Sequence, residues 1–377
     1  MRQKFGSLCL NWLINIVLLM ATIFLVLFVA EIHLRIFYVR NFHPDWEISG
    51  FHLPDPELIY FPRPSVFEDG RRITNSLGLR NEEILPKSQE VFRIITLGDS
   101  FTWGYEVESE DAYPKVLEEL LKTNRGINIE VINAGIQGFG TDQEYRLFIE
   151  RLVELEPDLL LVALSQNDYT YDNITKALYT IKNDKLVPLD ARKHWLYIQG
   201  TLFHKAPDWL RRSYLFDYFL TSLRGRDPFG LIPKLSEKGL FDWASDKAIK
   251  EIVNLNSLGK ERGFRLIVIV HPISSLFIFK DEGFSEAFVR SYLEKIEKEL
   301  IKNGIVFIDI NKDLLSWTSA NSQSFPPTIF GVLGEKTINY EELFVPDDRY
   351  FGERHLTVLG NEVFAELVFQ EIPKYLH

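Results

Sequence analysis

Residues 91–105 read V-F-R-I-I-T-L-G-D-S-F-T-W-G-Y, and this stretch decides how the rest of the chain is arranged. Residues 94–97 form a short apolar and β-branched run, which is typical of a strand buried on both faces. The run stops at Gly98, and from about Tyr113 the apolar spacing becomes helical. Ser100 is therefore predicted to lie at the end of a strand on the approach to a helix, where open α/β sheets place their chemistry.

The same alternation of strand and helix continues along the chain. Apolar runs predict strands at residues 127–133, 158–164, 264–270 and 305–310, and helical spacing predicts helices at residues 141–155, 243–262, 285–303 and 357–375. Strands that alternate with helices indicate a parallel sheet with right-handed crossovers. We therefore predict a three-layer α/β domain with a flavodoxin-like parallel sheet.

An insertion at about residues 169–240 interrupts this rhythm. Residues 177–189 alternate around Asn183-Asp184 as a hairpin does, and residues 195–223 are crowded with aromatic side chains and leucines. Three interpretations are open: a lid over the site, a surface that touches lipid or glycan, or a helix packed on the core. The third rests on an apolar stripe made of Leu210, Tyr214, Leu215, Tyr218 and Phe219.

An uncharged apolar segment precedes the domain. Residues 5–30 are dominated by Leu, Ile, Val and Phe and can cross the hydrocarbon of a bilayer as a helix. A cleaved signal peptide is the competing interpretation, but cleavage after Ala30 would put bulky Phe28 where a small residue is needed. We expect the chain beyond the helix to be extracytoplasmic. The predicted units are an anchor at residues 1–32, a proline-rich stalk or lead-in at 33–88 and a catalytic domain at 89–377.

Three further blocks accompany the serine. They read Asn133-Ala134-Gly135, Ser165-Gln166-Asn167-Asp168 and Glu353-Arg354-His355-Leu356, and a lead-in block reads Asn75-Ser76-Leu77-Gly78-Leu79-Arg80. In this order and spacing the chain resembles the SGNH (GDSL-type) hydrolase superfamily, in particular its membrane-anchored members. The resemblance extends from about residue 75 to the C-terminus. It implies that Ser100 is the nucleophile, that Gly135 and Asn167 are oxyanion donors, and that His355 is the base.

The chemistry of a serine nucleophile explains why such residues are needed together. A serine hydroxyl is too weakly acidic to attack an ester unaided, so it requires a base within hydrogen-bond reach and donors for the oxyanion. His355 competes for the role of base with His271, which follows the predicted strand at residues 264–270 and should emerge on the same edge. We favour His355, because it stands beside a carboxylate just before a helix.

The third member of the triad is the most open assignment. The commonest form of the family's last block has Asp three residues before the histidine, and Gly352 occupies that position here. Glu353 stands two residues before His355, and Asp347 and Asp348 lie further upstream. A carboxylate bonded to one ring nitrogen fixes the tautomer that lets the other nitrogen accept the serine proton. We predict Glu353 for this role, with Asp348 as the alternative.

Composition argues against several other classes of protein. The formal charge of -11, with no Lys/Arg-rich stripe, leaves no basic footprint for nucleic acid. The only cysteine is Cys9, within the apolar N-terminal segment, and the sequence has neither an HExxH motif nor a Cys/His cluster. We therefore expect no nucleic-acid partner, no metal and no cofactor.

These observations predict a membrane-anchored serine esterase or acyltransferase. Its expected substrates are O-acyl groups, in the first place acetyl, on envelope polysaccharide or lipid, because the tether confines the enzyme to the membrane surface. Hydrolysis and transfer share the acyl-serine intermediate, and the sequence does not choose between them. The alternative is a non-catalytic glycan-binding envelope protein with a degenerate hydrolase fold, which Gly352 would favour.

Overall fold

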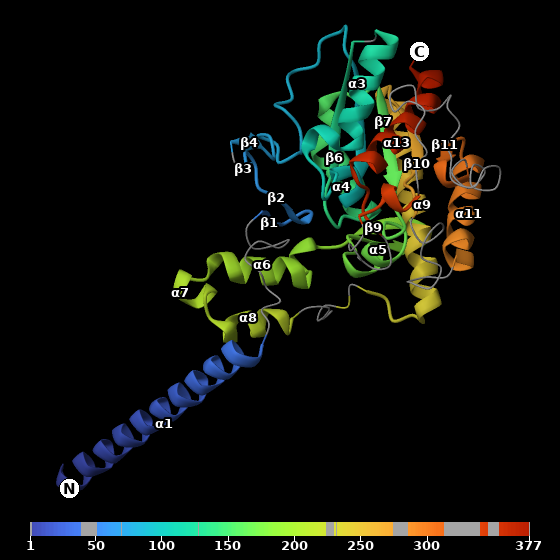
Figure 1. Ribbon diagram of the computed structural model, residues 1–377. Helices are drawn as coiled ribbons and strands as arrows, with labels where there is room; N and C mark the ends of the chain where they lie inside the picture. The colour runs from blue at the N-terminus through green and yellow to red at the C-terminus, as the bar shows by residue number, and fades with distance from the viewer. Residues whose placement is uncertain are drawn as a thin grey trace.

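A parallel sheet forms the centre of the protein (Figure 1). The computed structural model describes residues 2–38, 51–68, 70–126, 128–223, 230, 232–273, 286–312, 340–345 and 354–376. The sheet strands are β5 (Phe92–Gly98), β6 (Ile129–Gly135), β7 (Leu159–Leu164), β10 (Arg265–Val270) and β11 (Val306–Asp309). Their spatial order is β11-β10-β7-β5-β6, and every pair is parallel. In chain order this is the flavodoxin-like arrangement 2-1-3-4-5, as predicted.

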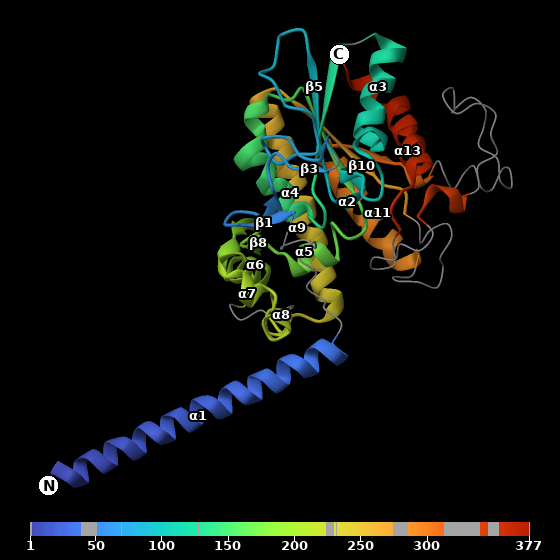
Figure 2. The same cartoon turned by 60° about the vertical axis from the view of Figure 1, so that its left-hand side comes forward.

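Helices cover both faces of the sheet, which confirms the three-layer prediction. On one face lie α3 (Tyr113–Arg125) and α13 (Val358–Glu371), side by side in Figure 2. On the other lie α4 (Thr141–Leu147), α9 (Glu237–Arg262) and α11 (Glu286–Lys302). Successive strand residues point to opposite faces of the sheet. Ile94 therefore packs in the core beneath α3 and α13, and Ile95 packs in the core beneath α4, α9 and α11.

Two helices that were predicted as continuous α-helices change to another helix type before they end. The helix expected at residues 141–155 begins as α4, widens into a π-helical turn at Phe148–Leu152 and closes as a 3-10 turn at Val153–Leu155. The last helix changes from α13 to a 3-10 turn at Ile372–Tyr375, where Pro373 has no N–H to continue the helix. Neither change alters which face of the sheet the helix covers.

The lead-in segment packs into the same hydrophobic core as the sheet. The strands β1 (His52–Asp55) and β2 (Ile59–Pro62) form an antiparallel hairpin, and Leu58, Ile59 and Tyr60 are fully buried in the same cluster as the sheet. A short ribbon follows, made of β3 (Phe67–Glu68) and β4 (Arg71–Arg72). The prolines that suggested a stalk break up long elements but do not prevent burial.

The described part of the insertion contains the predicted hairpin and several short helices. After α5 (Tyr171–Thr175), strands β8 (Tyr179–Lys182) and β9 (Lys185–Pro188) pair around Asn183 and Asp184, both with positive φ. Then come α6 (Trp195–Lys205), α7 (Asp208–Arg211) and α8 (Tyr214–Thr221). The stripe that was interpreted as core packing is only partly covered, since Tyr218 and Phe219 are exposed.

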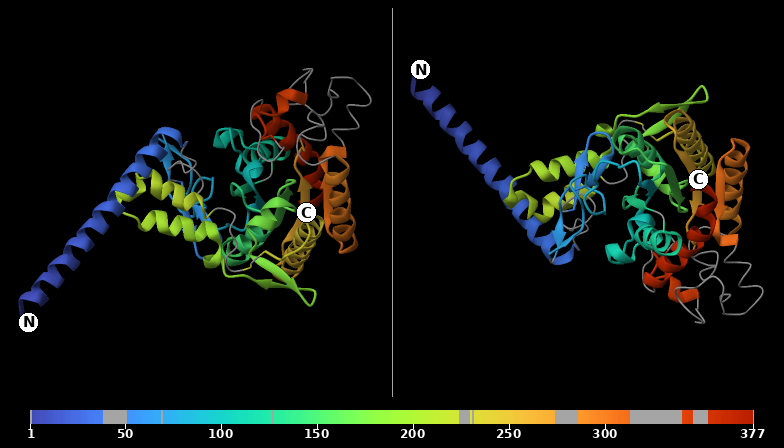
Figure 3. Two further views of the ribbon diagram at one scale, coloured as in Figure 1. Left: turned by 90° about the horizontal axis from the view of Figure 1, so that it is seen from below. Right: turned by 90° about the horizontal axis from the view of Figure 1, so that it is seen from above.

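One long helix, α1 (Arg2–Phe37), extends away from the rest of the molecule (Figure 1). Its residues Trp12–Phe37 are long and apolar enough to cross a membrane, and none of that window is buried within the protein. A signal sequence has the same length and composition, so the helix alone does not establish membrane insertion. Figure 3 shows α1 from two further sides, with the insertion helices beside its C-terminal end.

A buried histidine makes stability depend on pH. The His52 ring is 1% exposed, and neither ring nitrogen has a hydrogen-bond partner among the described residues. Burial lowers the pKa of His52 to about 3, from 6.5. As the pH falls below 6.5, His52 therefore takes up a proton in the unfolded state but not in the folded state. The free energy of unfolding decreases as a result, by about 2 kcal/mol at pH 5.

We expect His52→Phe to remove that loss. Urea unfolding of the variant and the parent at pH 7 and pH 5 measures the difference, because the other titrating groups are common to both proteins. His204→Phe is the control, since His204 on α6 is only half-buried. An equal pH dependence in the His52 variant and the parent would contradict the assignment.

Candidate active site

Ser100 stands where β5 gives way directly to the short helix α2 (Ser100–Trp103). Asp99 caps this helix, because its Oδ1 accepts a hydrogen bond from the Phe101 N–H at 2.9 Å. A Cβ on Gly98 would come within 2.1 Å of Thr102 Oγ1, so only glycine lets the helix start so close to the strand. The serine is thus presented at the carboxyl edge of the sheet, as the sequence predicted.

His355 reaches this serine from the other end of the chain. Its Nε2 lies 2.7 Å from Ser100 Oγ, within hydrogen-bond distance. The histidine is held by its backbone, because its carbonyl accepts the Val345 N–H at 2.9 Å, and by its ring, which packs against Phe101 and Tyr105. The structure therefore brings together the predicted nucleophile and the predicted base.

His271 lies nearby but is turned to another partner. Its Nε2 lies 3.1 Å from Thr102 Oγ1, and its ring is 1% exposed between Tyr113 and Phe364. Burial lowers the pKa of His271 to about 3, so the ring is neutral at physiological pH. This geometry fits a structural residue beneath α2.

The Asn167 amide is positioned by two carboxylates. Its Nδ2 donates to Asp99 Oδ2 at 2.9 Å and to Asp172 Oδ2 at 2.8 Å. Donation to an oxyanion would require one of these N–H groups to leave its carboxylate. Asp172 can release it most easily, because Lys176 Nζ lies 3.1 Å from its other oxygen.

The geometry does not support Gly135 as an oxyanion donor. Its N–H points away from the neighbouring strand and donates to Asn133 Oδ1 at 3.0 Å. A Cβ at this position would approach the Trp103 nitrogen to 2.4 Å. Gly135 is therefore glycine because α2 packs directly on the end of β6, and this close contact is the physical reason for the correction.

Gly138, three residues further on, is a candidate donor that the sequence did not single out. Its φ is +69°, and its N–H has no acceptor among the described residues. Its carbonyl accepts from Lys176, which connects it to Asn167 through Asp172. The Ser100 N–H is also without an acceptor in the described part of the chain. The available signal was a second turn glycine just beyond the strand end.

Three buried acids lie behind the nucleophile. Burial is the main cause that raises the pKa of Asp99, and it raises the pKa of Glu144 and Asp168 well above their usual values, with mutual repulsion adding to the shift. Neither carboxyl oxygen of Glu144 has a hydrogen-bond partner among the described residues. The raised pKa values of Glu144 and Asp168 favour their neutral forms, which would limit the negative charge close to the position where an oxyanion would form.

Arg80, the last residue of the lead-in block, fastens the far end of the nucleophile helix. Its guanidinium donates to the carbonyls of Trp103 at 2.9 Å, Gly104 at 2.5 Å and Val107 at 2.6 Å, and to Ser109 Oγ at 3.0 Å. The side chain is 9% exposed. A cation at the C-terminal end of α2 satisfies carbonyls that the short helix leaves unpaired.

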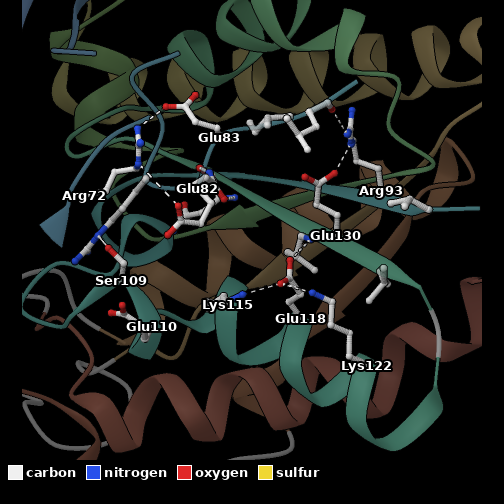
Figure 4. A pocket seen from close by; sticks show the side chains of 18 of the residues that line it. Arg72, Glu82, Glu83, Arg93, Ser109, Glu110, Lys115, Glu118, Lys122 and Glu130 are labelled. Carbon is white, nitrogen blue, oxygen red and sulfur yellow. Dashed lines mark hydrogen bonds and ion pairs between the residues drawn. The ribbon is translucent and has the colours of Figure 1, made fainter. Parts of the chain in front are cut away.

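A groove of about 700 Å³ lies beside the edge strand β6, under the lead-in (Figure 4). Many of its charged side chains are paired with one another: Lys115 and Lys122 with Glu118, Arg72 with Glu83, and Arg93 with Glu130. Neither Ser100 nor His355 lines the groove. It is therefore separate from the nucleophile.

The candidates for the third triad member, Glu353, Asp347 and Asp348, lie outside the described residues. Their assignment stays a prediction.

Several known proteins are similar to this chain. An arylesterase from Vibrio mimicus is 33% identical over 81 residues, which are 22% of this chain and 40% of that protein. Among solved structures, an acetyl xylan esterase has a TM-score of 0.42 and 17% identity, covering 74% of this chain and 100% of its own. An acetylxylan esterase from Geobacillus stearothermophilus has a TM-score of 0.39 and 13% identity, covering 74% and 94%.

Because the structural scores are below 0.5, family membership rests on a family model. The model of the GDSL-like lipase/acylhydrolase family matches residues 96–363, a segment that contains Ser100, Asn167 and His355. Since this match covers more than half of the chain, the protein belongs to the GDSL-like lipase/acylhydrolase family of ester hydrolases.

Proposed function

We propose that this ester hydrolase is anchored in a membrane by α1 and acts on O-acyl esters, in the first place acetyl, of envelope polysaccharide or lipid. The observation that carries the serine chemistry is the 2.7 Å contact between Ser100 Oγ and His355 Nε2. The exposed apolar surface of α1 supports the anchor, and a tether to the membrane favours substrates at the envelope.

In the acylation step, Ser100 Oγ forms a bond to the ester carbonyl carbon while its proton passes to His355 Nε2. The carbonyl oxygen becomes an oxyanion. When the tetrahedral intermediate collapses, the bond to the alkoxy oxygen breaks and the His355 proton goes to the departing alcohol. The products are the free alcohol and an acyl-serine.

Deacylation repeats these steps with a second nucleophile. His355 removes a proton from water or from a sugar hydroxyl, whose oxygen attacks the acyl carbon, and Ser100 leaves with its proton restored. Water yields a carboxylic acid, and a sugar hydroxyl yields a new ester. Hydrolase and transferase therefore differ only in which acceptor reaches the acyl-serine.

The proposed oxyanion donors are the N–H groups of Ser100 and Gly138 and the Asn167 amide. The two backbone groups have no acceptor among the described residues, so they can donate without breaking an existing bond. Loss of one donor of this kind typically costs about 3 kcal/mol of transition-state stabilisation.

We expect Ser100→Ala to abolish both ester hydrolysis and labelling by a fluorophosphonate, because only an activated serine displaces fluoride from phosphorus. Ser257→Ala is the control, because its exposed hydroxyl on α9 donates to the Val253 carbonyl at 2.9 Å and should not be the labelled group. An acyl-donor panel run with and without glycan acceptors then distinguishes hydrolysis from transfer. Labelling that persists in Ser100→Ala would refute the serine mechanism.

The two histidines should differ strongly in their effect on turnover. We expect His355→Ala to lower kcat by about 10⁴-fold, because a triad base works as a unit with its serine. His271→Gln, which keeps a polar group beside Thr102, should lower kcat by less than about tenfold. Thermal unfolding of both variants separates chemistry from misfolding. The reverse ranking would show that His271 is the base.

The carboxylate that orients His355 can be identified by isosteric replacement. We expect Glu353→Gln to lower kcat by roughly 10²-fold or more with little change in Tm, because the wrong histidine tautomer would then be populated. Asp348→Asn is the matched comparison, and Asp347→Asn a further control. If only Asp348→Asn loses turnover, Glu353 is not the orienting residue, and if all three are silent the enzyme uses a Ser-His dyad.

A further inference from the structure

The C-terminal end of α1 is joined to the insertion by a carboxylate. Glu31 accepts the N–H groups of Tyr214 at 3.0 Å and Leu215 at 2.9 Å, and the Ser213 hydroxyl at 2.9 Å. These groups form the N-terminus of α8, so Glu31 caps that helix from a distant part of the chain. Arg35, one turn later on α1, pairs with the same carboxylate at 2.9 Å.

Aromatic contacts extend this junction. The Arg35 guanidinium lies 5.0 Å from the centre of the Tyr214 ring, and the Tyr38 ring meets the Tyr218 ring edge-on at 5.6 Å. The Tyr38 hydroxyl also lies 3.3 Å from Thr221 Oγ1. In Figures 1 to 3 α8 lies across the end of α1, with α7 nearby. The position of α8 is thus fixed to the last two turns of α1.

Large apolar side chains remain exposed on the helices next to this junction. Trp209 on α7 is 73% exposed, and Phe219 on α8 and Leu202 on α6 are 50% and 41% exposed. Basic residues accompany them, with Arg212 exposed and Lys205 exposed at the end of α6. Aromatic rings beside cations are typical of the headgroup region of a bilayer, where one part of the side chain is apolar and the other is wet.

We propose that α7 and α8 form an interfacial platform that lies in the headgroup layer of the bilayer crossed by α1, with Trp209 and Phe219 inserted into it. This inference rests on the proposed membrane anchor. We assign a lipid surface as the partner of this platform, because the apolar run of α1 ends at Ala30 and Glu31, which contacts α8, follows directly. At 1.5 Å per residue, the N-terminus of α8 is bound within about one turn of the hydrocarbon boundary.

The platform would also fix the height of the active site. Helix α6 packs against the hairpin β1-β2, and in that hairpin the Tyr60 hydroxyl donates to the Gln137 carbonyl at 2.9 Å, one residue before Gly138. Packed elements therefore connect the headgroup layer with the proposed oxyanion donor. An ester would have to be presented at a set distance from the bilayer.

Depth-dependent quenching tests the platform in the full chain. In a Cys9→Ser background, single cysteines replace Trp209, Phe219, Leu85 and Leu19 and carry an NBD fluorophore. Each protein is reconstituted in phosphatidylethanolamine/phosphatidylglycerol vesicles with a nitroxide near the headgroup or deep in the acyl chain. Leu85 is the matched control, because it is an apolar residue that is 71% exposed on the lead-in. Retained ester hydrolysis confirms folding of each variant.

The result expected is that the shallow nitroxide quenches labels at positions 209 and 219 at least about twofold more than the label at 85. The deep nitroxide should quench the label at position 19, in the middle of α1. If position 19 is quenched while 209 and 219 behave like 85, the anchor holds and the platform is refuted. If position 19 is not quenched, the anchor itself fails and the platform with it.

Discussion

The site depends on the hydrogen bonds that the buried carboxylate of Asp99 accepts. One oxygen caps α2, and the other accepts from Ser165 and Asn167, which follow β7. These groups join the ends of β5 and β7, the two strands on either side of the point where the strand order reverses. A buried carboxylate without partners costs several kcal/mol, so the three donors both satisfy Asp99 and hold the nucleophile and the amide in register.

The outer edge of the sheet is stabilised by side chains in place of a further strand. Along β6 the outward N–H groups of Val131, Asn133 and Gly135 donate to Glu118 Oε2, Asn81 Oδ1 and Asn133 Oδ1. Unpaired edges invite pairing with another chain, and these contacts remove the free donors. They also leave the Gly135 N–H engaged with Asn133 at this edge, which does not favour its predicted role as an oxyanion donor.

The sequence predicted the sheet well, because strands buried on both faces leave continuous apolar runs such as residues 159–164. Ser100 and Asn167 could be placed at the edge of the sheet because each follows a strand whose end could be located, and His355 could be singled out because it precedes the last helix. The direction of the Gly138 N–H and the contacts of Arg80 could not be predicted from the sequence, since they depend on backbone geometry and on contacts between distant segments. The burial of the lead-in could not be predicted from the sequence, because prolines that break local elements carry no information on burial.

The lead-in has a practical consequence for preparing the enzyme without its membrane helix. A fragment that begins at residue 89 would omit Leu58 to Phe61 from the core, release the carbonyls that Arg80 binds, and expose the Asn133 N–H that Asn81 covers. Such a fragment would combine a loosened nucleophile helix with an open sheet edge, the combination that favours aggregation. A soluble fragment should therefore retain the hairpin β1-β2 and begin no later than Phe51.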